Sequence, residues 1–181
     1  MKLLSLFLFN LGVDAVSIEK GDAAVEKVIS DELVKCGRNS MSMPRCVLNL
    51  HDALLVETGR KYSCVCSDDS ARTAGHSTIP TNTGYGHGYN LVASCGIEGN
   101  SNVYKDLFEA YCDICSSACT YQSNPPMCAV ECMGNVSQSL GFCETKQITM
   151  LVGQGDMGIY SYGGDMFGSR YAGMTCAAFC V

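Results

Sequence analysis

The sequence lacks tryptophan altogether, and only 17% of its 181 residues are charged. Its 12 basic residues are scattered among 18 acidic ones, which leaves a formal net charge of −6. A nucleic-acid-binding protein needs a basic face to neutralise phosphates, and a similar face draws proteins onto anionic lipid headgroups. We therefore expect neither nucleic acid nor a membrane surface as a partner.

The sequence also lacks the common catalytic and cofactor-binding motifs. It contains no Gly-x-Ser-x-Gly elbow and no Walker loop, and no pair of carboxylates stands out as catalytic. The glycine pattern at 153–158 follows a predicted strand, but the residues after it cannot form the helix that would hold a pyrophosphate. We predict no cofactor and no resident metal, and we favour a protein that is not an enzyme.

Cysteine, in contrast, is abundant: the chain has 13. A reducing compartment would keep so many thiols free or use them for metal, so we predict an oxidising compartment. A positive start and an apolar run too short to span a bilayer predict a signal peptide over 1–17, cleaved after Ala15 or Ser17. The alternative is a buried N-terminal helix or strand. We expect a secreted or lumenal protein without a stable membrane span, folded as one disulfide-stabilised domain over 18–181.

The apolar spacing predicts an α+β fold, mostly helical, with short strands and long Gly-rich loops. Helices are expected over 23–36 after Asp22, from Pro44 to Gly59, and over 104–119. Strands are expected over 61–66 and 147–152. The polar segment 67–90 and the Gly-rich segment 153–173 are expected to be loops, and a last turn of helix to carry Cys176 and Cys180.

Four cysteines are spaced for a helical hairpin. Cys115 and Cys119 precede a Pro-Pro turn, and Cys128 and Cys132 follow it. Cysteines four residues apart share one face of a helix, so two antiparallel helices present them at matching depths. The geometry predicts disulfides between Cys115 and Cys132 and between Cys119 and Cys128.

This spacing resembles the twin Cys-x3-Cys hairpins of mitochondrial intermembrane-space chaperones. The resemblance covers residues 115–132 only, with a shorter separation between the pairs, and we interpret it as the same geometry reached independently. The alternative is a zinc site made of Cys112, Cys115, Cys128 and Cys132. Because nine further cysteines accompany these four, oxidation to disulfides is the simpler interpretation.

Few other residues suggest a site. His76 and His87 lie in the polar segment 67–90 and could bind metal, although loop histidines are more often exposed, and His51 is expected to be a surface or partly packed residue. Asn135 begins the one N-glycosylation motif that we find, which would mark that segment as exposed.

The odd number of cysteines leaves one without an intramolecular partner, either buried and inert or linking two subunits. The segment Gly153–Gly173 interleaves glycines with four rings, and aromatic side chains are favoured at interfaces. We therefore expect self-association through Tyr160, Tyr162, Phe167 and Tyr171. The rings could instead cover the domain's own core.

The favoured function is a non-enzymatic extracellular or lumenal structural or interaction protein, stabilised by about six disulfides and working as part of an oligomer or fibre-like assembly. One alternative is a small secreted hydrolase with its site in the 67–90 segment. Another is a lumenal accessory subunit of a larger membrane or organelle complex.

Overall fold

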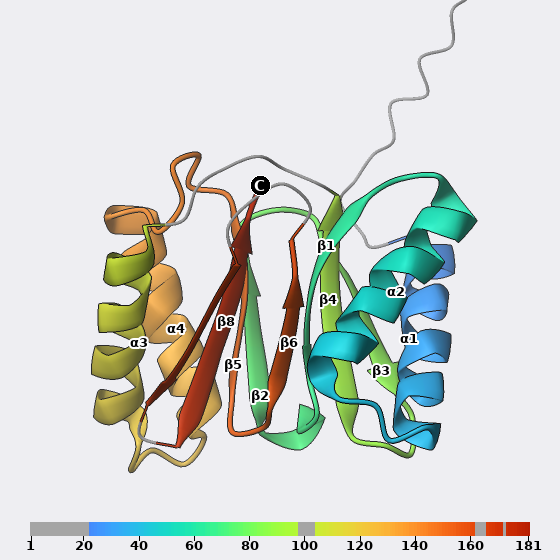
Figure 1. The fold of residues 1–181 in the computed structure, drawn as a ribbon. Coiled ribbons are helices and arrows are strands. Elements are labelled where there is room, and N and C mark those ends of the chain that lie inside the picture. The colour runs from blue at the N-terminus through green and yellow to red at the C-terminus, as the bar shows by residue number, and fades with distance from the viewer. Residues whose placement is uncertain (1–21, 98–103, 162–165, 172) are drawn as a thin grey trace, which may run out of the picture.

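The computed structural model describes residues 22–97, 104–161, 166–171 and 173–181, and for 166–171 the backbone alone. The predicted signal peptide at 1–17 and Tyr162 lie outside these residues. Two pairs of helices enclose two central sheets, so that the layers run helices, sheet, sheet, helices (Figure 1). No helix in the described ranges is long and apolar enough to cross a bilayer.

Within the described residues, three α-helices form where the apolar spacing predicts them, and a fourth forms where the cysteine hairpin requires one. They are α1 (Ala23–Arg38), α2 (Met43–Thr58), α3 (Lys105–Cys119) and α4 (Pro125–Ser139). The Asp22 side chain accepts a hydrogen bond from the Ala24 amide at 2.9 Å, which caps α1 as expected. Gly59 ends α2 with φ +67°, a left-handed conformation that glycine adopts without strain.

Eight strands form two antiparallel sheets. Sheet A has the order β3-β4-β1-β6 and sheet B the order β2-β5-β8-β7. Together with the helices, these strands confirm the α+β class. The strand bounds are β1 Tyr62–Ser67, β2 Thr73–Ser77, β3 Asn82–Gly86, β4 Leu91–Ile97, β5 Ile148–Gly153, β6 Met157–Tyr160, β7 Met166–Tyr171 and β8 Met174–Cys180.

Three apolar clusters hold the layers together. One lies between α1, α2 and sheet A, and a second between α3, α4 and sheet B. The third fills part of the space between the sheets and consists of Val65, Leu151, Ala177 and Phe179, with Met157 and Ile159 packed against it. Because the strands alternate their side chains, each sheet contributes one face to a helix pair and the other to its neighbouring sheet.

Three expected segments are corrected by the structure. The 67–90 segment is not a loop: it contains a short 3-10 helix, η1 (Ser70–Arg72), and strands β2 and β3. The 153–173 segment contains β6 and β7 rather than one Gly-rich loop. Cys176 and Cys180 lie on strand β8, not on a helix. Residues four apart share a face in both structures, so their spacing does not distinguish a strand from a helix.

Six disulfides connect the layers and elements. Cys115 is bonded to Cys132 and Cys119 to Cys128, the two pairs that the hairpin geometry predicts. The other pairs are Cys36–Cys46, Cys64–Cys95, Cys112–Cys176 and Cys143–Cys180. Cys112 and the hairpin cysteines are therefore consumed by disulfides, which excludes the alternative zinc site. Disulfides in this number are typical of proteins that fold in oxidising compartments.

The thirteenth cysteine, Cys66, is a free thiol on β1 and is fully buried. Its sulfur lies 3.8 Å from the sulfur of Met43 on α2. Burial raises the pKa of the Cys66 thiol to about 12. Of the two outcomes expected for the odd cysteine, the structure thus favours the buried thiol, because Cys66 cannot reach another subunit from this position.

Candidate functional site

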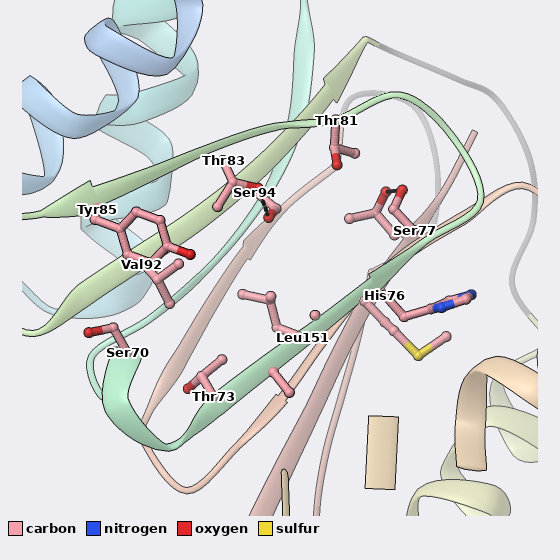
Figure 2. Close-up of a pocket in the computed structure, with 14 residues that line it drawn as sticks. Ser70, Thr73, His76, Ser77, Thr81, Thr83, Tyr85, Val92, Ser94 and Leu151 are labelled. Atoms are coloured by element: carbon pink, nitrogen blue, oxygen red, sulfur yellow. Dashed lines mark hydrogen bonds between the residues drawn. The ribbon is translucent and has the colours of Figure 1, made fainter. Parts of the chain in front are cut away.

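A cleft opens between the two sheets on the side where β2 and β3 form their edges. It has a volume of about 290 Å³ and is lined by residues of η1, β2, β3, β4 and β5. One wall is the inner face of β3 and β4, and the other is the inner face of β2 and β5 (Figure 2). Most of the lining comes from the 67–90 segment.

Hydroxyl side chains dominate both walls of the cleft. The hydroxyl-bearing lining residues are Ser70, Thr73, Ser77, Thr81, Thr83, Tyr85, Ser94 and Thr149. Their placement follows from strand alternation: Thr81, Thr83 and Tyr85 lie two apart along the chain and share one face. Gly84, between Thr83 and Tyr85, turns to the other side and lies so close to Ile29 of α1 that an added Cβ would be 2.5 Å from its Cγ2.

Two hydroxyl pairs face the cleft from opposite walls. Thr83 and Ser94, directly opposite each other on β3 and β4, hydrogen-bond at 2.8 Å. Ser77 and Thr149, directly opposite on β2 and β5, hydrogen-bond at 2.7 Å. Figure 2 shows Thr83 and Ser94 on one wall and Ser77 on the other.

The two pairs differ in what they can offer a ligand. Within the first pair one of two hydroxyl protons is used, so Thr83 and Ser94 keep one donor and several lone pairs. In the second pair Thr149 can donate to Ser77, which itself donates to the carbonyl oxygen of Ile79 at 2.7 Å. Because Ser77 also accepts from the Ile79 amide at 3.2 Å, the lone pairs that this pair offers are those of Thr149. One wall can donate and accept, and the other accepts.

No charged side chain lines the cleft within the described residues. His76 belongs to the lining, but its ring turns toward α4, where a Cβ added to Gly134 would be 3.0 Å from His76 Nδ1 (Figure 2). Apolar contact comes from Val92 and Leu151, and the half-exposed ring of Tyr85 lies at the edge. A cleft of this kind suits an uncharged ligand with several hydrogen-bonding groups.

A shallower hollow of about 500 Å³ continues from the edge of the cleft. It shares Ser70 and Tyr85 with the cleft and extends over the turn after β3, past His87 and Asn90. The two histidines that the sequence singled out are therefore separated: His76 points to α4 from sheet B, while His87 is exposed beside sheet A. Among the residues that the structure describes, no group of three potential ligands is placed to hold a metal ion.

The ring of Tyr160, predicted to lie at a subunit contact, packs within its own domain. Its centroid is 4.1 Å from that of His51 on α2. His51 is itself buried, which corrects its expected surface or partly packed position, and its Nδ1 donates to the carbonyl oxygen of Tyr62 at 2.9 Å. Tyr162 and the side chains of Phe167 and Tyr171 lie outside the described residues, so only Tyr160 can be placed.

Asn135 is exposed on α4, inside a helix rather than in a turn. Ser137, the third residue of its motif, is buried and donates its hydroxyl to the carbonyl oxygen of Gly134 at 2.8 Å. A glycosyltransferase would therefore have to reach this motif before α4 packs, and a sugar on Asn135 remains a prediction.

The order of residues in the 67–90 segment contains a sign of the two strands that line the cleft, although the polar composition of the segment suggests a loop. In 73–77 and 81–85 the hydroxyl-bearing residues Thr73, Ser77, Thr81, Thr83 and Tyr85 all fall on alternate positions, which is the period of a strand with a polar face. Which two sheet faces meet depends on the chain topology, and the sequence pattern does not specify that.

Comparison with protein-family models, with curated proteins and with solved structures found nothing that matches this chain.

Proposed function

We propose that this chain is a non-enzymatic extracellular or lumenal interaction protein that binds a small, uncharged, hydroxyl-rich ligand, such as a neutral sugar, in the cleft between its sheets. One observation carries the proposal: two hydrogen-bonded hydroxyl pairs, Thr83–Ser94 and Ser77–Thr149, face each other across the cleft, and no charged side chain of the described lining lies between them. A ligand hydroxyl both donates and accepts, so it complements the donor of one wall and the acceptors of the other.

The size and depth of the cleft support a small ligand. Its volume of about 290 Å³ lies just below the usual range for ligand pockets, roughly 300–1,000 Å³. Ser94 and Thr149 are buried, whereas Tyr85 is 51% exposed at the edge. Polar groups therefore lie deep in the cleft. The ring of Tyr85, at the edge, can cover an apolar face of a sugar.

The same lining disfavours the alternative of a hydrolase with its site in the 67–90 segment. Hydrolysis requires a general acid or base, or an activated nucleophile, within hydrogen-bond reach of the substrate. The described lining offers hydroxyls without a carboxylate, and its one histidine turns away from the cleft. We therefore favour binding over catalysis at this place.

The disulfides support a role outside the reducing cytosol. Cross-links that close loops in both helical pairs and both sheets restrict the unfolded chain and so favour a durable fold. In this proposal residues 1–17 direct export and are removed, and Asn135 carries a sugar if the secreting cell glycosylates it.

Self-association has one observation in its favour. Strand β7, inside the segment expected to make a subunit contact, is an edge strand of sheet B, and an edge strand can pair with another chain. The buried Cys66 and the contact of the Tyr160 ring with His51 add no support to it. An assembly through β7, including one in which the chain is a subunit of a larger complex, is a second candidate that light scattering under native conditions tests.

Calorimetric titration with a defined panel tests the binding proposal. The neutral probes are D-glucose, D-galactose, D-mannose and N-acetyl-D-glucosamine, and D-glucuronate and D-glucosamine serve as charged controls. We expect a neutral sugar to bind, and Thr83→Val to weaken it by about tenfold, the equivalent of one lost hydrogen bond.

Thr175→Val is the matched control, because Thr175 is on the inner face of β8 and does not line the cleft. It should leave the affinity unchanged. The proposal is wrong if no neutral sugar binds, or if the two valine variants bind equally well.

A further inference from the structure

The order of elements in the chain repeats. Two helices are followed by four strands in residues 23–97, and again two helices by four strands in residues 105–180. Pairing β1 with β5, β2 with β6, β3 with β7 and β4 with β8 converts the order of sheet A into the order of sheet B. Each sheet thus contains three strands of its own half and the second strand of the other half.

The buried positions of the helices repeat at a constant spacing of 83 residues. The buried residues of α1 and α3 correspond one to one: Val25 and Phe108, Ile29 and Cys112, Glu32 and Cys115, Leu33 and Ser116, Cys36 and Cys119. Those of α2 and α4 do so as well: Met43 and Pro126, Cys46 and Ala129, Val47 and Val130, Leu50 and Met133, His51 and Gly134, Leu54 and Ser137. No described buried position in these helices lacks its counterpart.

Contacts repeat as well, and so do cross-links, although the second cysteine of the helix–helix disulfide lies one residue earlier in the second half, at Cys128 beside Ala129, than Cys46 does in the first. Each half joins the last turn of its first helix to the first turn of its second, through Cys36–Cys46 and through Cys119–Cys128. The second helix of each half packs on the exchanged strand from the other. There the ring of Tyr160 lies against His51 of α2, and at the equivalent place the ring of His76 lies over Gly134 of α4.

We infer that the chain is an internal duplication of one unit of two helices and four strands, and that the two halves exchange their second strands. The duplication gives the chain a second copy of the cleft, which the side chains of Met157 and Ile159 fill. By the strand registers, the closed copy lies between β6 and β1 on one side and β7 and β8 on the other. The ligand class of this second site is inherited from the open cleft, so that part of the inference rests on the proposed function.

Two positions decide which copy is open. Thr73 lies opposite Gly153 on β5, and its counterpart Met157 lies opposite Ser67 on β1. Gly75 lies opposite Leu151, and its counterpart Ile159 lies opposite Val65. Met157 and Ile159 pack against the apolar cluster between the sheets, whereas threonine and glycine leave that volume empty in the open copy.

The residues of the opposite wall, on β3 and β4 in the open cleft and on β7 and β8 in the closed copy, differ as well. Ser94, which belongs to the donor pair of the open cleft, corresponds to Ala177 on β8, and its partner Thr83 corresponds to Gly168 on β7. The closed copy therefore lacks the hydroxyl pair as well as the space. The acceptor wall is retained in part, since Thr149 corresponds to Ser63 on β1.

Reciprocal exchange of these residues tests the inference. The closing variant is Thr73→Met with Gly75→Ile, and the opening variant is Met157→Thr with Ile159→Gly. In crystal structures we expect the first to fill the cleft as Met157 and Ile159 fill its counterpart, and the second to show a new cleft beside β6. This readout does not depend on any ligand. An added Cβ at Gly75 would be 3.1 Å from Leu151 Cδ2, so Thr73→Met alone is the milder closing variant.

Titration with the same neutral sugars supplies the second readout. The closing variant should lose at least about tenfold in affinity, equivalent to about 1.4 kcal/mol. The opening variant combined with Ala177→Ser should raise the stoichiometry from one to two. If the wild-type chain binds no sugar but the two crystal structures show the expected filling and opening, the proposed function is wrong and the duplication holds. If the variants fold with intact disulfides but the cleft stays open in the first, or no space appears in the second, the inference is overturned.

Discussion

Gly75 on β2 and Ile159 on β6 occupy equivalent positions in the two halves of the chain, and they differ by an entire side chain. Ile159 lies opposite Val65 and packs into the cluster between the sheets, while Gly75 lies opposite Leu151 and lines an open cleft. The difference explains why the space between the sheets is filled on one side and accessible on the other.

The long-range disulfide should contribute more to stability than the short one. Cys112–Cys176 joins residues 64 apart and Cys119–Cys128 residues 9 apart. By loop-closure entropy, replacing both cysteines by alanine should cost about 4 kcal/mol in the first case and about 3 kcal/mol in the second. Chemical denaturation followed by circular dichroism measures both. Equal costs, or a larger cost for the short loop, would contradict this ranking.

Cys66 should make the folded state less stable at alkaline pH. Burial raises the pKa of this thiol from 9.0 to about 12, so the folded chain holds a proton that the unfolded chain releases. The contribution is complete below pH 9 and is lost as the pH rises toward 12, with a slope of roughly 1.4 kcal/mol per pH unit.

Cys66→Ala provides the control, because it removes the titrating group. The difference in unfolding free energy between the wild type and this variant should be nearly the same at pH 8 and 9 and clearly smaller at pH 10.5. A constant difference across that range would show that the thiol does not titrate as its burial requires.

Gly158 on β6 should not tolerate a side chain. A Cβ there would lie 2.2 Å from the Met43 carbonyl oxygen of α2, a backbone atom that cannot move alone. We expect Gly158→Ala to destabilise the fold by about 2–3 kcal/mol, the cost of overpacking. Gly59→Ala is the comparison: it meets no neighbouring atom within 4 Å, and only its φ of +67° is strained, at about 1 kcal/mol. A smaller loss at Gly158 than at Gly59 would refute the close approach of α2 to β6.

The helices could be predicted from the sequence because their apolar residues follow helical spacing and their caps are clear. Asp22 and Gly59 mark helix ends as expected. Strands β3 and β6 could not be recognised, since tight packing replaces apolar side chains by glycine: Gly84 and Gly158 are glycines because helices α1 and α2 lie against them. Glycine in these strands therefore marks close packing rather than a loop.

The cleft itself could not be derived from local patterns. Ser77 and Thr149 are 72 residues apart in the chain and meet only because β2 leaves its own half to pair with β5. The hairpin disulfides, in contrast, depend on one local turn, and the structure contains the pairs that the spacing predicts.

The most direct measurement of the central claim is a titration of the isotope-labelled chain with the four neutral sugars, followed through its backbone amide resonances. The account predicts shift changes concentrated on β2, β3 and the facing residues Ser94 and Thr149, with no such changes on β6 or from the charged sugars. An unchanged spectrum with every neutral sugar at millimolar concentration, or changes confined to surfaces away from the cleft, would contradict it.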